Sequence, residues 1–389
     1  MKIERKYKFL YLDDNDKVFR DGDVELLNTL SDRIEVTTDY PSSWSKQSKR
    51  LVQEVNDGSI EGLILDWELT NNSVEAKEGS DGAEDIDFSA ESIAEHLRVN
   101  AAKELKDIPI ILCSADKNNS FTKHKKLELT SRDLFDLTFD KKELFDSNVE
   151  SSERMLYDLG KSYKLLQRKA GKSELIDLLC ITDGELGLLD IRFVDSVQRM
   201  YKSKTVHDFI QFLLRDFIEC EGILIDDRVL AARLGVDIDN SKDWKKLKQI
   251  LVESNISYSG ILSKGWDRSW AFKLEEWWYN KISKDDLRTM KASNRVNLLK
   301  ESLGLDIIAA DKIKFCTSDE FWTVCFGSRR PIDPANGFLV ANTNQQPWLE
   351  NKYVSGLAEL EKNDKKGWRI DVVDRDNYSR FKSLLLGIK

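Results

Sequence analysis

The chain has 389 residues, of which 41% are hydrophobic and 33% are charged, a composition typical of a globular protein with two or three domains. No apolar stretch is long enough to cross a bilayer, and the amino terminus lacks the apolar core and cleavage site of a signal peptide. The cysteines are scattered without CxxC spacing, so a zinc site is not expected. We therefore expect a cytoplasmic protein with no membrane partner.

Charge is unevenly distributed along the chain. Residues 1–150 carry 21 lysines and arginines against 33 aspartates and glutamates, a net charge of −12, whereas residues 151–389 carry 39 against 36, a net charge of +3. An acidic first part is a poor direct binder of nucleic acid. Eight of the ten tryptophans lie between Trp244 and Trp368. These differences predict a first domain over 1–150 and a different region beyond it.

The first 150 residues alternate between short apolar runs and amphipathic segments. The runs predict strands at 7–12, 34–38, 63–65, 108–113 and 133–139, and the segments predict helices at 16–30, 45–55 and 89–105. Alternation of strand and helix is typical of a parallel sheet covered by helices. We therefore predict an α/β fold, a doubly wound five-stranded parallel sheet of the flavodoxin-like kind. Residues 71–87, rich in acid, Asn, Ser and Gly, are expected to form an inserted mobile loop.

Polar residues follow four of these apolar runs. Asp13 and Asp14 follow the first run, and Asp66 follows GLIL. Ser114 follows IPIILC, and Lys141 and Lys142 lie beside the end of the last run, LFDLTF. The carboxyl ends of parallel strands meet at one edge of a sheet, so these side chains are expected to lie together.

Such a group of side chains suits phosphoryl transfer to a carboxylate. The reaction needs a positioned nucleophile, a metal ion and fixed positive charge, and Asp66 would be the nucleophile. Asp13 and Asp14 would hold Mg²⁺, with Asp66 and the backbone carbonyl of Glu68 as further ligands. The Ser114 hydroxyl would donate to a phosphoryl oxygen, and Lys141 or Lys142 would pair with the phosphoryl charge.

These residues resemble the receiver domain of bacterial two-component response regulators, over about residues 5–150. In that family an acidic pair ends the first strand, the phospho-accepting aspartate ends the third, Ser or Thr ends the fourth and a lysine ends the fifth. The resemblance implies that these roles belong to Asp13 with Asp14, Asp66, Ser114, and Lys141 or Lys142. The local strings LDWEL and IPIILCSAD are similar to the family's own patterns.

The chain departs from the family pattern at two places. The family lysine is usually followed by proline, whereas this sequence reads FDKKELF, so either lysine could serve, with Lys141 slightly favoured. If Lys142 serves, Phe139 occupies the position of the family's aromatic switch residue. The acidic insert after Asp66 replaces a short loop and could restrict which kinase docks.

The resemblance implies a cytoplasmic signalling protein whose partner is a histidine kinase or a related ATPase. Many receivers form dimers, so a homodimer is one expectation, and the only enzymatic activity implied is phosphoryl acceptance with autodephosphorylation. Atypical receivers joined to unclassified domains occur in bacterial regulatory and phage-defence systems. Two alternatives stay open for residues 1–150: a pseudo-receiver adaptor that is never phosphorylated, and a set of carboxylates that only serve strand-end turns.

Beyond residue 150 the sequence is less informative. An amphipathic pattern predicts a connecting helix over 151–172, followed by an α+β effector or interaction domain over 173–389. Within it, residues 173–300 are expected to be mostly helical, and residues 301–389 to mix strands at 321–326, 338–341 and 368–373 with a final helix at 377–386. We identify no family for this region.

Several motifs of this second region could carry function. Residues 226–251 resemble a helix-turn-helix, with lysines that could face phosphates at 242, 245, 246 and 248, but a solvated helix face is the favoured interpretation. Trp266, Trp270, Trp277 and Trp278 are interpreted first as core packing. The Arg329–Arg330 pair could bind phosphate. A receiver-gated nuclease that uses Asp226, Asp227, Asp371 and Asp374 is a further alternative.

Overall fold

The computed structural model describes residues 6–67, 69, 88–101, 105–115, 133–168, 175–203, 205–342, 345–362 and 367–386. Contacts between Cα atoms divide the chain into two compact units, each made of three chain segments. Unit 1 comprises residues 1–178, 196–213 and 261–266. Unit 2 comprises residues 179–195, 214–260 and 267–389.

Unit 1 is built on a five-stranded sheet with the order β2-β1-β3-β4-β5. Every neighbouring pair of strands is parallel, and the register places Asp66 beside Cys113 and Ser114 beside Asp140. This confirms the predicted five-stranded parallel sheet with helices. Its strands are β1 (Tyr7–Leu12), β2 (Ile34–Asp39), β3 (Gly62–Asp66), β4 (Ile110–Ser114) and β5 (Leu137–Asp140).

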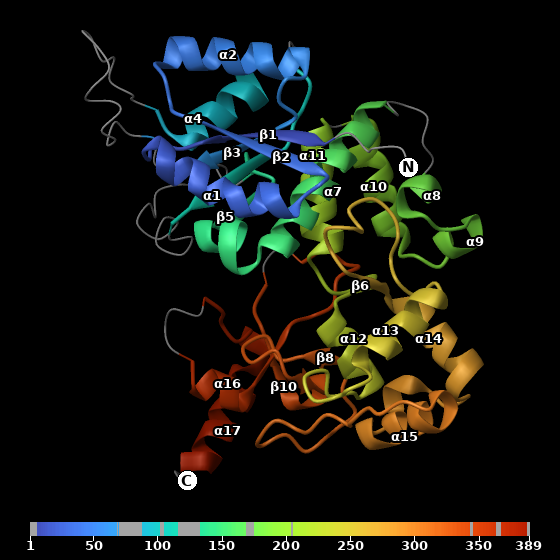
Figure 1. Ribbon diagram of the computed structural model, residues 1–389. Coiled ribbons are helices and arrows are strands. Elements are labelled where there is room, and N and C mark those ends of the chain that lie inside the picture. Colours follow the sequence, from blue (N-terminus) through green and yellow to red (C-terminus); the bar gives the residue numbers. More distant parts are fainter. Residues whose placement is uncertain are drawn as a thin grey trace. The chain divides into compact units, whose positions relative to one another are not determined.

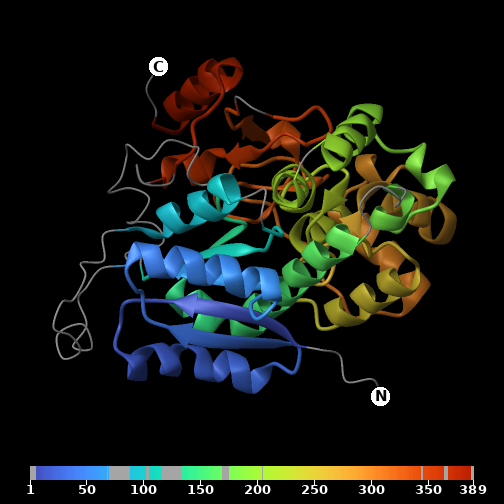
Figure 2. The same ribbon diagram turned by 90° about the horizontal axis from the view of Figure 1, so that it is seen from above.

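Helices cover both faces of this sheet (Figures 1 and 2). Side chains alternate between the faces of a strand, and Leu10 and Leu12 of β1 pack with α2 (Trp44–Asp57) and α4 (Ala90–Glu95) in one buried cluster. On the other face, Tyr11 of β1 contacts Phe145, whose ring centroid lies 5.1 Å from its own. That face is covered by α1 (Lys17–Leu30), the π-helical turn η2 (Glu143–Ser147) and α7 (Val149–Arg168).

Unit 1 extends beyond the first 150 residues. The helix expected to connect two domains over 151–172 is α7, and it packs against β1 and β2 within unit 1. The Asp158 carboxylate of α7 accepts hydrogen bonds from the backbone N–H groups of Lys264 (2.7 Å) and Gly265 (2.9 Å). The helix α11 (Val206–Leu213) also packs on α7. These later segments therefore belong to the same unit as the sheet.

The helix expected over 89–105 is shorter and changes its geometry. It begins as α4, capped by the Ser89 hydroxyl, and continues as the π-helical segment η1 (His96–Asn100). Residues 102–104 lie outside the described residues. The π-helical turn brings Arg98 to a buried position, where its side chain is 6% exposed.

The close approach of Gly62 to Phe9 gives a first prediction. A Cβ atom added at Gly62 would lie 2.3 Å from Cε1 of the fully buried Phe9 ring. We expect Gly62→Ala to lower the free energy of unfolding in urea by about 1–3 kcal/mol, as overpacking does in tight cores. As a control, Gly22→Ala in the exposed part of α1 meets no atom within 4 Å and should raise stability by about 0.5–1 kcal/mol. Equal effects of the two changes would contradict this packing.

Unit 2 combines many helices with short antiparallel strand pairs, as predicted for the carboxyl-terminal region. The paired strands are two or three residues long. They are β6 (Leu224–Ile225) with β7 (Ser269–Trp270), β8 (Thr323–Val324) with β9 (Pro331–Ile332), and β10 (Gly337–Leu339) with β11 (Tyr353–Ser355). A large cluster of buried side chains from residues 225–324 forms its main core, and a second cluster lies within 313–370.

The helices from residue 175 onward, which lie in both units and include α11, are mostly short. The others are α8 (Leu175–Leu179), α9 (Asp183–Leu186), α10 (Ile191–Ser203), η3 (Leu214–Ile218), α12 (Asp227–Leu234), α13 (Trp244–Glu253), α14 (Ala271–Trp277), η4 (Trp278–Ile282), η5 (Leu287–Thr289), α15 (Ala292–Leu303), η6 (Pro334–Asn336), α16 (Gly356–Leu360), η7 (Val372–Asp374) and α17 (Arg375–Leu386).

The predicted strand over 368–373 is wrong. Ile370 forms only an isolated bridge with Val340, and the chain then turns into the 3₁₀ helix η7. The Asp371 side chain accepts a hydrogen bond from the Val373 N–H and so caps η7. An aspartate that can cap a helical turn competes with strand pairing, and this local hydrogen bond explains the difference.

Candidate phosphoryl-accepting site

The predicted polar residues meet at the carboxyl edge of the unit 1 sheet. Asp13 follows β1, Asp66 is the last residue of β3, Ser114 is the last residue of β4, and Lys141 follows β5. Oxygen atoms from Asp13, Asp14 and Asp66 lie within 4.8 Å of one another. Parallel strands deliver their ends to one edge, and this is why residues far apart in the sequence form one site.

Asp13 is fully buried and is held by hydrogen bonds on both of its oxygens. Oδ1 accepts from the Asn15 N–H at 2.7 Å, and Oδ2 accepts from the Lys141 ammonium at 2.6 Å and from the Tyr11 hydroxyl. Burial acts to raise the pKa of Asp13, but Lys141 and these hydrogen bonds outweigh it, so the pKa lies below its usual range. Asp13 is therefore a fixed negative charge.

Lys141 links the two buried carboxylates. Its ammonium lies 2.6 Å from Asp13 Oδ2 and 3.3 Å from Asp66 Oδ1, and its side chain is 17% exposed. Asp66 and Asp13 hold the pKa of Lys141 above its usual value in spite of burial, which acts to lower it. Lys142 is exposed, and its backbone N–H bonds to Asp140. The structure thus places Lys141, rather than Lys142, beside Asp66.

As a charged group, Asp66 is less stabilised than Asp13. It is 8% exposed, and burial raises its pKa to about 7, with further increases from Asp13 and Asp14, while Lys141 opposes the shift. No backbone N–H of the described residues donates to Asp66 in the way that the Asn15 N–H donates to Asp13. A cation bound at this edge of the sheet would therefore favour the ionised form of Asp66.

The chemistry of this donor set fits Mg²⁺. This cation prefers one or two carboxylates together with water and phosphate oxygens, and Asp13, Asp14 and Asp66 offer three oxygens in reach of one another. Glu68, the fourth proposed ligand, and the acidic insert 71–87 both lie outside the described residues. Ser114 lies at the same edge and is 5% exposed.

Sequence reasoning missed Tyr11. This residue is fully buried in β1, and its hydroxyl reaches Asp13. The signal was present in the sequence, because residues two apart in a strand share a face and Tyr11 precedes Asp13 by two. A tyrosine ring in an otherwise aliphatic run, YKFLYL, needs a hydrogen-bond partner when it is buried.

The lysines of the suspected helix-turn-helix are arranged differently from such a motif. The helices α12 and α13 are separated by residues 235–243, a segment longer than the usual three or four residues. Lys242 lies 3.2 Å from Asp306, and Lys248 pairs with Asp227. Lys245 and Lys246 are exposed. These contacts favour a solvated helix face.

The charged residues singled out for phosphate binding or nuclease chemistry have structural partners. Arg329 pairs with Asp226, which also caps α12 by accepting from the Val229 N–H at 2.8 Å. Arg330 donates to the backbone oxygens of Asp311 and Lys312. In the part of the chain that the structure describes, the cluster of Asp13, Asp14 and Asp66 is the one acidic group close enough to hold a metal ion.

The tryptophan-rich segment serves packing. Trp266, Trp270, Trp277 and Trp278 are all buried, between 1% and 7% exposed. Trp270 lies in a cluster of aromatic rings, with its centroid 5.3 Å from that of Tyr258 and 6.1 Å from that of Phe217. Buried rings in edge-to-face contact are a core arrangement and leave no open face for a ligand.

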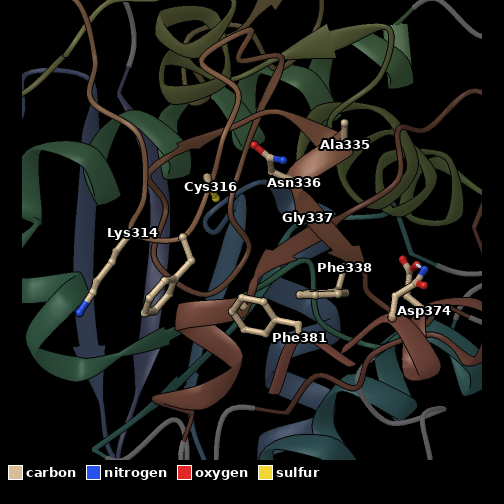
Figure 3. Close-up of a pocket in the computed structure, with 11 residues that line it drawn as sticks. Lys314, Cys316, Ala335, Asn336, Gly337, Phe338, Asp374 and Phe381 are labelled. Atoms are coloured by element: carbon tan, nitrogen blue, oxygen red, sulfur yellow. Dashed lines mark hydrogen bonds between the residues drawn. The ribbon is translucent and has the colours of Figure 1, made fainter. Parts of the chain in front are cut away.

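Unit 2 has a pocket of about 310 Å³ beside α17. Figure 3 shows Phe338 and Phe381 side by side in this pocket, below Asn336. Two polar groups of its wall are used within the fold: Asn336 Oδ1 accepts from two backbone N–H groups, and Asp374 Oδ2 accepts from the Leu339 N–H at 2.8 Å. We assign no ligand to this pocket.

Comparison with known proteins gave no match: no family model, curated protein or solved structure is similar to this chain. Among the described residues, no helix combines the length and apolar character that crossing a membrane requires.

Proposed function

We propose that unit 1 is a receiver domain of the response-regulator kind and accepts a phosphoryl group on Asp66. The observation that carries the proposal is the convergence of Asp13, Asp14, Asp66 and Lys141 at the carboxyl edge of a parallel sheet with the order β2-β1-β3-β4-β5. This edge is where open parallel sheets bind ligands. The arrangement provides a carboxylate nucleophile, a metal-binding pair and a fixed cation within one small volume.

The chemistry follows from these roles. An Asp66 carboxylate oxygen attacks phosphorus, a new O–P bond forms, and the bond to the donor's leaving group breaks. Mg²⁺ held by Asp13 and Asp14 would neutralise phosphoryl oxygens. Lys141, 3.3 Å from Asp66, pairs with the charge that arrives, and the Ser114 hydroxyl donates to a phosphoryl oxygen. Water later cleaves the acyl phosphate and restores the Asp66 carboxylate.

The proposed output is a change in what the rest of the chain binds. Lys141 immediately follows β5, and η2 and α7 follow Lys141 on the face of the sheet that carries Tyr11 and Phe145. A shift of Lys141 towards a phosphoryl group would move this segment, and segments 196–213 and 261–266 pack in the same unit. The partner would be a histidine kinase or a related ATPase, in a bacterial regulatory or phage-defence system.

A phosphoryl mimic tests the proposal directly. We expect Mg²⁺ with beryllofluoride to raise the thermal stability of the wild-type protein, by about 2.7 kcal/mol at a hundredfold excess over the dissociation constant. Asp66→Ala should abolish this effect. Asp57→Asn removes an exposed carboxylate of the same unit and should leave it intact. A response in the Asp66 variant, or no response in the wild type, would favour a pseudo-receiver adaptor instead.

The exposed apolar face of α1 suggests where a protein donor binds. Val18, Phe19, Leu26 and Leu30 are between 41% and 81% exposed, and α1 begins at Lys17, three residues after Asp14. We define these four residues as the α1 apolar patch. Apolar side chains gathered on one exposed helix face are typical of an interaction surface, and this one begins beside the acceptor edge.

Phe19→Asp is therefore expected to slow phosphoryl transfer from any histidine kinase that phosphorylates the wild type, by about tenfold or more. Transfer from acetyl phosphate, which needs no protein docking, should be unchanged. Val373→Asp in unit 2 is a matched control, because Val373 and Phe19 are 68% and 67% exposed. Equal slowing with both donors would show that Phe19 acts on the site itself, and the docking role would then be wrong.

A further inference from the structure

Tyr11 holds an unusual position for a tyrosine. Its strand, β1, lies between β2 and β3, its ring is fully buried on the face of the sheet that η2 covers, and its hydroxyl donates to Oδ2 of Asp13. Phe145 of η2 packs against the ring at a centroid distance of 5.1 Å. The packed ring therefore holds the hydroxyl at Asp13.

The hydrogen bonds to Asp13 come from groups of different mobility. The Asn15 N–H belongs to the backbone, and the Tyr11 hydroxyl is carried by a ring fixed in the sheet. Lys141 is a flexible chain and is shared with Asp66, 3.3 Å away. When Lys141 turns to a phosphoryl group on Asp66, Asp13 Oδ2 keeps the Tyr11 donor. Without Tyr11, that oxygen would lose its remaining protein donor in a fully buried position.

We propose that Tyr11 is a positioning residue of the metal site, which fixes the Asp13 carboxylate in the orientation that binds Mg²⁺. The inference deepens the proposed receiver function and rests on it. Carboxylates that bind metals are usually oriented by a hydrogen bond from a second group, and loss of that group typically weakens metal affinity by about 10-fold to 100-fold. Tyr11 supplies this bond from inside the sheet, where water does not reach.

The test compares the Mg²⁺ affinity of the full chain with that of Tyr11→Phe, by isothermal titration calorimetry. Phenylalanine keeps the buried ring, and in the variant Asp13 still accepts from Asn15 and Lys141, so the protein should fold. We expect the dissociation constant for Mg²⁺ to rise about tenfold. The stability of each variant is followed in urea, so that loss of folding is distinguished from loss of affinity.

Tyr163→Phe is the matched control. Tyr163 is also fully enclosed in unit 1, at 1% exposed, and its hydroxyl also donates to an aspartate, Asp136, at 2.6 Å. This variant loses the same group at another place, so it should lose stability without a change in Mg²⁺ affinity. If both variants weaken Mg²⁺ binding equally, the effect of Tyr11 is only structural and the inference is overturned.

The remaining outcomes separate this inference from the proposed function. If the wild type binds Mg²⁺ and Tyr11→Phe binds it as tightly, Tyr11 does not position Asp13, but the receiver proposal stands. If the wild type does not bind Mg²⁺, or if Asp13→Asn binds it as well as the wild type, both proposals fail. If Tyr11→Phe binds Mg²⁺ more weakly than the wild type and Tyr163→Phe does not, the receiver proposal and the positioning role of Tyr11 are both supported.

Discussion

Replacing Asp136 by alanine should destabilise unit 1 more than any change at its surface. We expect the free energy of opening of the β5 and α11 amides, measured by hydrogen exchange, to fall by about 3–5 kcal/mol, because the change leaves a buried cation without its main partner. That cation is Arg98, whose side chain is 6% exposed and donates to Asp136 Oδ2 at 2.8 Å.

Asp136 ties together elements from distant parts of the chain. Besides Arg98 of η1, it accepts hydrogen bonds from the Tyr163 hydroxyl of α7 at 2.6 Å and from the Ile110 N–H of β4 at 2.8 Å. Nδ1 of His207, in α11, lies 3.1 Å from Asp136 Oδ1. Its other nitrogen lies 2.7 Å from the Asp133 carbonyl oxygen. One carboxylate thus holds segment 196–213 to the sheet.

The same carboxylate makes stability depend on pH in a definite direction. Burial acts to raise the pKa of Asp136, but Arg98, His207 and Tyr163 outweigh it and hold the pKa below its usual value. A group whose folded pKa lies below its unfolded value of about 3.9 contributes stability above that pH, and this contribution is lost as the pH falls through the folded pKa. The free energy of unfolding of Asp136→Asn should therefore fall less than that of the wild type as the pH is lowered through this range.

An exposed ion pair of the same unit is the control. Asp21 pairs with Lys17 on the surface of α1, and both side chains are largely solvated. Such pairs contribute little, so Asp21→Ala should leave the exchange of β5 and α11 unchanged. If Asp136→Ala and Asp21→Ala had similar effects, Asp136 would not be the link between α11 and the sheet.

The sheet and the group of polar residues at its carboxyl edge could be predicted from the sequence because the signal is local and repeated. Each strand is a short apolar run, and four of the five runs are followed by a polar residue of the candidate site, as in GLILD with Asp66. Parallel pairing then places those residues at one edge without any further information. The choice between Lys141 and Lys142 could not be made this way, because adjacent residues differ only in the direction of their side chains.

The extent of unit 1 could not be predicted from the sequence. Composition changes near residue 150, yet α7, α11 and segment 261–266 pack with the sheet. Their attachment includes long-range hydrogen bonds, such as that from the Gly265 N–H to Asp158 at 2.9 Å and that between His207 and Asp136. No periodicity marks such pairs, because each partner alone is an ordinary polar residue.

Replacing Lys141 by methionine should separate metal binding from the response to a phosphoryl group. The Lys141 ammonium lies within 2.6 Å of Asp13 and 3.3 Å of Asp66, so it competes with a cation for the same oxygens. We expect Lys141→Met to bind Mg²⁺ about tenfold more tightly, a free energy of about 1.4 kcal/mol. In calorimetry, wild type and variant are compared at the same ionic strength, because salt screens such charges.

The same variant should lose the stabilisation by beryllofluoride, because the fixed positive charge that would face the phosphoryl mimic is gone. Lys142→Met is the matched control: it removes the neighbouring exposed lysine and should change neither the Mg²⁺ affinity nor the beryllofluoride response. If Lys142→Met lost the stabilisation by beryllofluoride and Lys141→Met kept it, Lys142 would be the lysine of the site. If Lys141→Met instead binds Mg²⁺ more tightly and loses the beryllofluoride response, one ammonium accounts for both effects. Lys141 would then be the counter-ion of Asp13 and Asp66 before phosphorylation and the partner of the phosphoryl group after it.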